Sequence, residues 1–324
     1  MIYIESSSHD PYYNLALEEY MFNEFEDDCF MLWQNDNTIV VGKFQNTIEE
    51  INLPYVEEKN INVVRRMTGG GAVYHDLGNL NFTFITGRKD ENTFNFSYFI
   101  QYIVEALKLY GVEASFSSRN DITVDGRKIS GNSEYIRGDR ILHHGTILFD
   151  SDLSVVSGAL NTSRLKFESK SVKSVKSRVA NLKSFFREDV SLEDFKDVLK
   201  KTVFGSEDVE EAILSENDEL KVKELRDSKY ATWEWNYGKS PKSAVVKKAR
   251  GDGGIVEVFL EIENGCIKSA EFKGDFFAEE GLEEAAKGLR GCKFTPHDVR
   301  AGVAETAELI HGVEADWLAE LILS

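Results

Sequence analysis

Residues 65–76 bring together the residue types best suited to holding an anionic ligand. Two residues separate Arg65-Arg66 from three consecutive glycines, Gly69 to Gly71. Glycines place no side chain between their backbone amides and a ligand, so anionic oxygens can approach closely. Neighbouring arginines add permanent positive charge and paired donors for a carboxylate or a phosphate. The run predicts an anion-binding loop, and a plain turn between two strands with solvated arginines is the alternative.

A second group of candidate residues lies between Asn120 and Asn132. Asp125-Gly126 is a strong hairpin turn, so strands are expected on both sides of it. Strand alternation puts Lys128 on the face opposite Ile129, near the small Ser130 and Gly131, which leave room for a ligand. A lysine close to a hairpin tip is usually solvated. Lys128 is therefore a candidate only in combination with the arginine–glycine run.

The common signatures for nucleotides, metals and nucleophiles do not fit. A GxGxxG pattern fails because Tyr74 stands where its last glycine belongs, and Gly238-Lys239-Ser240 ends like a P-loop but has Trp233 in place of the first glycine. His143 and His144 are strand neighbours, so they should point to opposite faces rather than bind one metal. HExxH and GxSxG motifs are absent from the sequence.

Composition narrows the class of protein. The net charge of −18 disfavours nucleic-acid binding, which needs cations against phosphates. No stretch approaches the roughly 20 apolar residues of a membrane helix. The start of the chain lacks the features of a signal peptide, and Cys29, Cys266 and Cys292 are too far apart to suggest a disulfide framework or a zinc site. We expect a cytoplasmic protein without membrane or nucleic-acid partners.

The periodicities predict mixed elements, and so an α+β fold. Helical patterns follow Asp10-Pro11 and recur around residues 99–107 and after Ser191, while the strand patterns lie mainly between residues 30 and 149. Residues 238–254 resemble a basic, glycine-rich linker. After it, a hairpin turns at Asn264-Gly265 and three short helical segments follow. The tail, residues 245–324, is expected to be a small α+β domain.

Many separate motifs, in order, give the chain its resemblance to a known family. It resembles the lipoate–protein ligases along nearly its whole length. The matching residues are Asp10-Pro11, Asn14 to Glu19, Trp33, Asn35, Gly42, Gln45-Asn46, Arg65 to Asp76, Gly78-Asn79, Asn120-Asp121, Lys128 to Gly131, His143 to Thr146, Ser174 to Val179 and Trp233 to Trp235. One such motif would be weak evidence, but a series at the family's spacing is specific.

The resemblance implies both a fold and a set of site residues. Residues 1–244 would form the catalytic domain that this family shares with biotin protein ligases, in which mixed β-sheets pack with helices. The residues implied to bind ATP and the lipoyl-adenylate are Arg66, Gly71, Ala72, Val73, Tyr74 and Lys128, with Asn79 and Asp121 nearby. Lys128 would be the catalytic residue. No protein-held metal is implied, since Mg²⁺ would arrive with ATP.

The implied reaction has two steps. Lipoate and ATP would form lipoyl-AMP with release of pyrophosphate, and the lipoyl group would then pass to a lysine of an acceptor protein. The implied acceptors are the lipoyl domains of 2-oxoacid dehydrogenase complexes or the glycine-cleavage H protein. The first step needs no base, because a carboxylic acid is already ionised at pH 7. It needs fixed cations and good alignment, which Lys128 and Arg66 would provide.

Three alternatives stay open from the sequence. An octanoyl or lipoyl transferase of the same fold would act without ATP, and a thioester mechanism would then require a nucleophilic cysteine. Cys29 alone precedes residue 266, and it lies in neither motif. A biotin ligase would also have a basic, glycine-rich loop, although the sequence of residues 65–76 resembles that of the lipoate ligases. A protein that only carries or senses lipoate would not need both Arg66 and Lys128.

Overall fold

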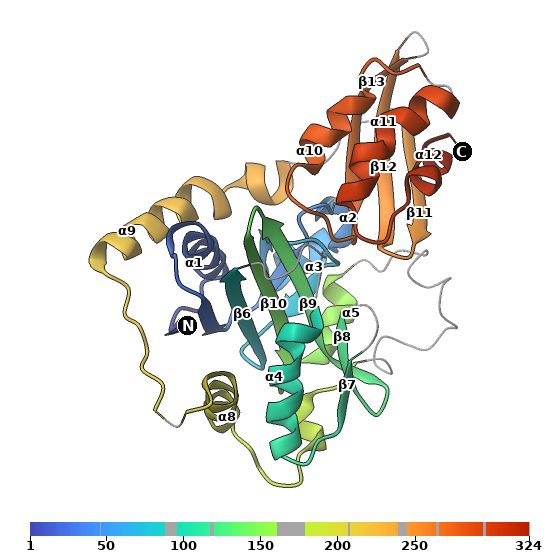
Figure 1. Cartoon of the computed structure of the whole chain (residues 1–324). Helices are drawn as coiled ribbons and strands as arrows, with labels where there is room; N and C mark the ends of the chain where they lie inside the picture. Colours follow the sequence, from blue (N-terminus) through green and yellow to red (C-terminus); the bar gives the residue numbers. More distant parts are fainter. Residues whose placement is uncertain are drawn as a thin grey trace.

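The structure is a computed structural model, and it describes residues 1–45, 47–87, 96–116, 120–160, 179–206, 208–238, 245–263, 266–293 and 296–323. A seven-stranded sheet forms its centre (Figure 1). In spatial order, its strands are β1 (Ile2–Glu5), β2 (Cys29–Trp33), β6 (Asn79–Gly87), β10 (Arg140–Leu148), β9 (Arg127–Arg137), β8 (Asp121–Val124) and β7 (Ala114–Phe116). All neighbours are antiparallel except β1 and β2, which are parallel.

Helices cover both faces of this sheet because its strands are apolar on both sides. Phe30 and Phe84 pack on one face with helices α4 (Phe96–Leu109) and α8 (Leu192–Phe204). Met31 and Ile85 pack on the other face with α1 (Pro11–Glu24) and α9 (Glu216–Leu225). Helix α1 begins where Asp10 accepts backbone hydrogen bonds and Pro11 supplies a preset φ, and α8 begins with the predicted capping box at Ser191.

A second, three-stranded sheet faces the α1 side of the large one. Its order is β4 (Asn62–Arg65), β3 (Thr38–Val41) and β5 (Val73–His75), with β3 and β4 parallel and β3 and β5 antiparallel. The remaining short elements are α2 (Thr47–Glu50), α3 (Leu53–Glu58), α5 (Leu153–Ala159), the 3-10 helix at Leu182–Phe185, and two π-helical turns, η2 (Arg226–Tyr230) and η3 (Glu234–Gly238). The arginine–glycine run therefore connects β4 to β5.

The C-terminal residues form a small unit at the top of Figure 1. Its sheet has the order β11 (Val245–Gly251), β12 (Gly254–Glu263) and β13 (Cys266–Gly274), all antiparallel. The helices packed on it are α10 (Leu282–Ala285), the 3-10 turn Ala286–Leu289, α11 (Pro296–Leu309) and α12 (Ala315–Leu323). The predicted α+β class is confirmed, with mixed sheets in the large part and a small α+β unit after it.

One sequence interpretation is wrong in part. The basic segment that resembles a linker forms strand β11 over residues 245–251, where its backbone pairs with β12. Two of its charged residues are accommodated by ion pairs, Lys248 with Glu257 and Arg250 with Asp275. The predicted boundary at residue 244/245 adjoins residues 239–244, which lie outside the described part, and it stays a prediction.

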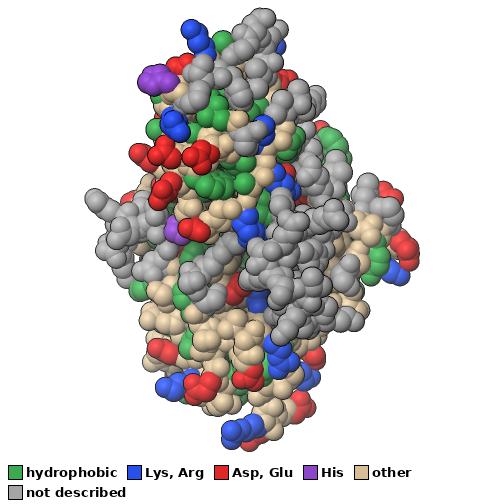
Figure 2. Space-filling model, turned by 90° about the vertical axis from the view of Figure 1, so that its right-hand side faces the viewer, with side chains coloured by type: hydrophobic (Ala, Val, Ile, Leu, Met, Phe, Trp, Pro, Cys, Tyr) green, Lys and Arg blue, Asp and Glu red, His purple; other side chains and the backbone are tan. Residues whose placement is uncertain are grey.

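Charged side chains are spread over the described surface. Figure 2 shows one face, on which side chains of both charges are scattered and a group of acidic ones lies on the small unit. In the part of the chain that the structure describes, no helix has the length and apolar character needed to cross a bilayer.

Candidate functional site

A cavity of about 450 Å³ lies between the large sheet and the strands β3 and β5. Its floor is a row of residues from neighbouring strands of the large sheet: Trp33, Asn81, Thr146, Gly131 and Asp121. Asn81 is the strand partner of both Trp33 and Thr146. Gly131 is the strand partner of Asp121, and its amide donates to Thr146 Oγ1 at 3.3 Å. The row therefore crosses the strands from an aromatic end to a charged end.

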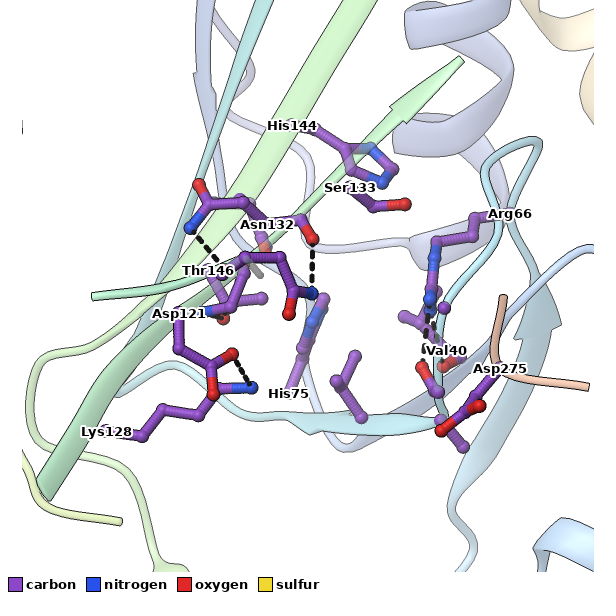
Figure 3. Close-up of a pocket in the computed structure, with 18 of the residues that line it drawn as sticks. Val40, Arg66, His75, Asp121, Lys128, Asn132, Ser133, His144, Thr146 and Asp275 are labelled. Carbon is purple, nitrogen blue, oxygen red and sulfur yellow. Dashed lines mark hydrogen bonds and ion pairs between the residues drawn. The ribbon is translucent and has the colours of Figure 1, made fainter. Parts of the chain in front are cut away.

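Lys128 and Asp121 form the charged end, as Figure 3 shows. Lys128 Nζ lies 2.7 Å from Asp121 Oδ1, and both side chains are about one-third exposed, at 34% and 32%. The hairpin is as predicted, with Asp125 and Gly126 both at positive φ. A Cβ on Gly131 would lie 2.9 Å from Lys128 Nζ, so this glycine lets the lysine lie flat across the strand.

One further contact fixes the backbone of Lys128. Its carbonyl accepts a hydrogen bond of 3.0 Å from the Ala180 amide, and Val179 forms an isolated β-bridge with Lys128. The motif of residues 174–179 that contributes to the family resemblance lies outside the described residues except for Val179. Its described end thus meets the backbone of the predicted catalytic lysine.

Arg66 lies on the other side of the cavity and is almost completely buried. Its guanidinium donates to the carbonyls of Val40 at 3.2 Å, Gly69 at 2.6 Å and Gly71 at 2.9 Å, and to Thr68 Oγ1 at 2.9 Å. Burial lowers the pKa of Arg66 to about 10, which leaves it charged at neutral pH. Arg66 therefore shapes the glycine loop and adds a positive charge to the cavity wall.

Arg65 points away from the cavity and is held by residues far along the chain. The Arg65 amide donates to Asn236 Oδ1 at 2.9 Å, and the Arg65 carbonyl accepts from Trp235 Nε1 at 2.8 Å. The guanidinium donates to the carbonyls of Trp235 at 3.0 Å, Gly42 at 2.9 Å and Gln45 at 2.7 Å. The tryptophan motif near residue 235 thus clamps the end of β4, from which Arg66 follows.

The small unit docks on the glycine loop. The Gly70 amide donates to the Phe276 carbonyl at 3.0 Å, and a Cβ on Gly69 would lie 2.1 Å from that same oxygen. Gly70 has a φ of +93°, which favours glycine. Gly69 and Gly70 therefore allow close backbone contact between the two parts. Asp275 reaches the cavity wall beside Gly71 (Figure 3).

A buried polar network supports the wall next to Arg66. His144 Nδ1 lies 2.8 Å from Glu18 Oε1, and His144 Nε2 lies 2.8 Å from Thr68 Oγ1. Glu18 also accepts from Thr83 Oγ1 at 2.7 Å. His143 points to the opposite face, as expected, where it stacks on Phe99 and pairs with Glu134. Burial lowers the pKa of His143.

The structure brings together most of the predicted site residues. Arg66, Gly71, Ala72, Val73, Asp121 and Lys128 all line the cavity. The Tyr74 side chain lies on the other face of β5, where its hydroxyl donates to Asn37 Oδ1 at 3.1 Å, so only its backbone can face a ligand. Asn79 is buried and donates to Asn81 Oδ1 at 3.0 Å, but it does not line the cavity. The roles of all these residues stay predictions.

Sequence reasoning did not single out several residues of the cavity. Trp33, His75, His144 and Thr146 stand in the motifs that carry the family resemblance, and their alternation along strands could have placed them on one face. Asp275 gives no such signal, because it belongs to the small unit and reaches the cavity only through docking.

Comparisons with known proteins agree over nearly the whole chain. A family profile for the lipoyl protein ligase A/B catalytic domain matches residues 10–204, and one for the bacterial lipoate protein ligase C-terminus matches residues 240–322. Lipoate–protein ligase 1 of Staphylococcus aureus is 42% identical over 285 residues, which cover 87% of each chain. Lipoate-protein ligase LplJ of Bacillus subtilis is 42% identical over 317 residues, which cover 96% of each chain.

Solved structures show the same relationship. The P. falciparum LipL1 structure in complex with lipoate has a TM-score of 0.83 at 27% identity and covers 99% of both chains. A lipoate-protein ligase A bound with ATP has a TM-score of 0.64 at 30% identity and covers 73% of this chain and 97% of that one. Sequence and fold therefore agree, and the chain belongs to the lipoate–protein ligase family.

Proposed function

We propose that this protein joins free lipoate to ATP as lipoyl-AMP and transfers the lipoyl group to a lysine of an acceptor protein. The observation that carries the proposal is the cavity itself. It has an exposed lysine–aspartate pair at one end, a tryptophan at the other and a buried arginine in its wall. Relatives with ATP or lipoate bound support this use of the cavity.

Lys128 is the residue that we assign to the first step. The carboxylate of lipoate and the α-phosphate of ATP are both anions, so a cation must lie between them as they approach. Lys128 is the accessible cation of the cavity floor, and Asp121 and Gly131 orient it. Arg66 adds charge from the wall and, through its bonds to Gly69 and Gly71, keeps the loop in shape.

The residues present fit a magnesium ion that arrives with ATP. Mg²⁺ is usually bound by one or two carboxylates together with substrate phosphates and water. Asp121, at the charged end of the cavity, is the carboxylate that would take this place. When bound, Mg²⁺ supplies charge neutralisation for the departing pyrophosphate. Asp121 would also keep Lys128 aligned.

The row of residues across the sheet sets the direction of the acyl chain. With its carboxyl group at Lys128, the chain would run over Gly131 and Thr146 toward Trp33, where Leu15 and Val40 add apolar surface. Neighbouring strands are spaced by about 4.8 Å, so this path is several strand spacings long. The expected apolar slot for the lipoyl chain therefore lies between the two sheets.

The second step needs an amine from the acceptor. A lysine ammonium must lose its proton before it attacks the mixed anhydride. We propose that the acceptors are lipoyl domains of 2-oxoacid dehydrogenases or the glycine-cleavage H protein. An archaeal relative that was solved with its E2 lipoyl domain supports this class of acceptor. That structure is 31% identical, with a TM-score of 0.66.

The ATP-independent transferase is disfavoured by the state of Cys29. Its thiol is buried in β2 and donates to the Asp27 carbonyl at 3.3 Å. Burial raises the pKa of Cys29 to about 12, so the nucleophilic thiolate is scarce at neutral pH. Cys29 also does not line the cavity.

Intact mass spectrometry of an acceptor domain tests the proposal. Wild-type protein with lipoate should add a lipoyl mass to the acceptor only when Mg-ATP is present. Lys128→Ala should lower adenylate formation by at least about 100-fold, because the main cation at the reacting oxygens is lost. Lys183→Ala is the matched control, since Lys183 is also a partly exposed lysine paired with an aspartate, 3.2 Å from Asp150.

Two results would contradict different parts of the proposal. Modification from an acyl-carrier donor without ATP would move the protein to the transferases. Wild-type turnover by Lys128→Ala would leave the enzyme class intact and remove the assigned role of Lys128.

A further inference from the structure

Two buried polar groups at the tryptophan end of the cavity lack partners. His75 is 3% exposed and Asn81 is 1% exposed, and both line the cavity. Among the described residues, neither His75 Nε2 nor Asn81 Nδ2 has a hydrogen-bond partner. The His75 ring lies 6.4 Å from that of Trp33, and Asn81 pairs with Trp33 across the strands. Buried polar groups are nearly always satisfied, so these two indicate a ligand atom or a water.

A chain of amides fixes which nitrogen of His75 carries the proton. Asn14 Nδ2 faces the carbonyls of Ser8 and Gln34, so it must be the amide nitrogen. Because this nitrogen cannot accept a hydrogen bond, the Asn35 atom 3.0 Å from it must be Oδ1, which shares one of its two hydrogens. The remaining group of Asn35, Nδ2, then donates to His75 Nδ1 at 3.2 Å. With Nδ1 accepting, the proton of the neutral ring is on Nε2.

His75 also stays neutral. Burial, with the positive charge of Arg66 nearby, lowers the pKa of His75 to about 3. At physiological pH, His75 therefore presents an uncharged N–H donor and does not act as a proton donor or a counter-ion. Asn81 presents a second uncharged donor, because its Oδ1 already accepts from Asn79.

The two donors lie too far from Lys128 to hold the carboxyl group. The Lys128 ammonium lies beside Gly131, and from Gly131 through Thr146 to Asn81 is two strand spacings, or about 10 Å. His75 lies at the same end as Asn81, because its ring is 6.4 Å from that of Trp33, the strand partner of Asn81. If the carboxyl group lies at Lys128, as in the proposed function, the donors meet the far end of the acyl chain.

We propose that His75 and Asn81 select an acyl group whose far end carries hydrogen-bond acceptors, the ring sulfurs of lipoate, over an unsubstituted alkyl chain such as octanoate. The inference rests on the proposed function. Sulfur is a weak acceptor, but an alkyl chain is none, and it would leave two buried donors unpaired. A site built around polar groups discriminates strongly against an analogue that cannot pair with them.

Binding measurements on the whole protein test this without requiring turnover. Isothermal titration calorimetry with lipoate and with octanoate gives the ratio of their dissociation constants. Wild-type protein should bind lipoate about tenfold more tightly. His75→Phe and Asn81→Leu should each reduce this preference severalfold, chiefly by improving octanoate binding. His75→Gln, which keeps an N–H donor, should retain more of it than His75→Phe.

Thr38→Val is the matched control. Thr38 pairs with His75 across β3 and β5 but does not line the cavity, so its loss should leave the ratio unchanged. Urea unfolding checks that each variant is folded. An equal ratio in wild type, or an unchanged ratio in folded His75→Phe and Asn81→Leu, would overturn the inference and indicate that a resident water satisfies the donors. Failure of the proposed function would be seen separately, as a lack of ATP-dependent acceptor modification.

Discussion

Gly131 and Lys128 show how one missing side chain can determine the position of another. The ammonium group occupies the space that a Cβ at position 131 would need, and in that position it meets Asp121. The geometry at Lys128 thus depends on a residue with no functional group of its own.

Gly131→Ala should therefore displace the lysine. The added carbon would lie 2.9 Å from Lys128 Nζ and 3.0 Å from Cε, and the flexible end of the lysine would move aside. We expect adenylate formation, measured as pyrophosphate release, to fall about tenfold or more, since misplacement by an ångström is costly. The free energy of unfolding should change by less than about 1 kcal/mol, since only a mobile side chain must move. Gly87→Ala, where a Cβ meets nothing within 4 Å, is the control. Unchanged release in Gly131→Ala would show that the position of Lys128 is not critical.

His75 should make the stability of the protein depend on pH. Its pKa is about 3 in the folded protein and about 6.5 in the unfolded chain, so below pH 6.5 the unfolded chain binds the proton first. Stability should therefore fall as the pH drops, and His75 should account for about 2 kcal/mol between pH 7.5 and 5.

Urea unfolding at these two pH values measures the loss. His75→Gln should lose correspondingly less stability than wild type, because it has no group that titrates there. A substitution of the exposed His9 by Gln should follow wild type. Equal losses in wild type and His75→Gln would contradict the assignment of His75 as a buried neutral ring.

At the scale of elements, the turns η2 and η3 hold the end of β4, although they lie about 170 residues later in the chain. Asn236 Oδ1 accepts from the Arg65 amide, and Asn236 Nδ2 donates to the Tyr230 carbonyl at 2.6 Å. These bonds hold the end of the strand that leads to Arg66. The clamp therefore connects a segment outside the cavity to the shape of the glycine loop.

Asn236→Ala should weaken both stability and activity. The Arg65 amide would be left buried without its partner, which costs about 1–3 kcal/mol in the free energy of unfolding. Adenylate formation should also fall, and its decline should persist under conditions where the variant is fully folded by circular dichroism. Asn62→Ala is the control, since Asn62 lies in β4 but its side chain makes only an exposed contact of 3.4 Å. Full activity in folded Asn236→Ala would reduce the clamp to a purely structural role.

The elements around the site were predictable where neighbouring residues determine the structure. The turn at Asp125-Gly126 fixes the hairpin, and strand alternation then places Lys128 beside Gly131 and separates His143 from His144. Strand β11 was missed because its charges resemble a linker, although an edge strand tolerates them. The clamp was missed for another reason. It joins Arg65 to residues 170 positions later, and the sequence has no pattern that records such a pair.

At the scale of the whole molecule, the two parts share their cores. Phe277, from the small unit, is 2% exposed and packs with Phe96 in the main core, while Phe44 of the large part stacks on Phe276. Two domains were predicted from the sequence, but no pattern in it indicated that aromatic rings of each part pack against the other. The presence of Asp275 in the cavity wall depends on the same docking.

Phe277→Ala should destabilise the protein as a core substitution does. We expect a loss of about 3–5 kcal/mol in the free energy of unfolding, measured in urea, because a fully buried ring is removed from the main core. Phe116→Ala, at a position that is 37% exposed, should cost far less. A loss below about 1 kcal/mol for Phe277→Ala would mean that the small unit is only loosely attached.

The docking of the small unit is made largely by the polypeptide backbone. The Gly70 amide meets the Phe276 carbonyl, and the Gly274 amide meets the Phe44 carbonyl at 2.5 Å. Backbone hydrogen bonds do not involve side-chain atoms, so side chains around them can change while the docked arrangement is kept. Gly69 is an exception, because any side chain there would clash with the Phe276 carbonyl. The glycine loop must therefore fit the neighbouring unit as well as the ligand that is proposed to bind it.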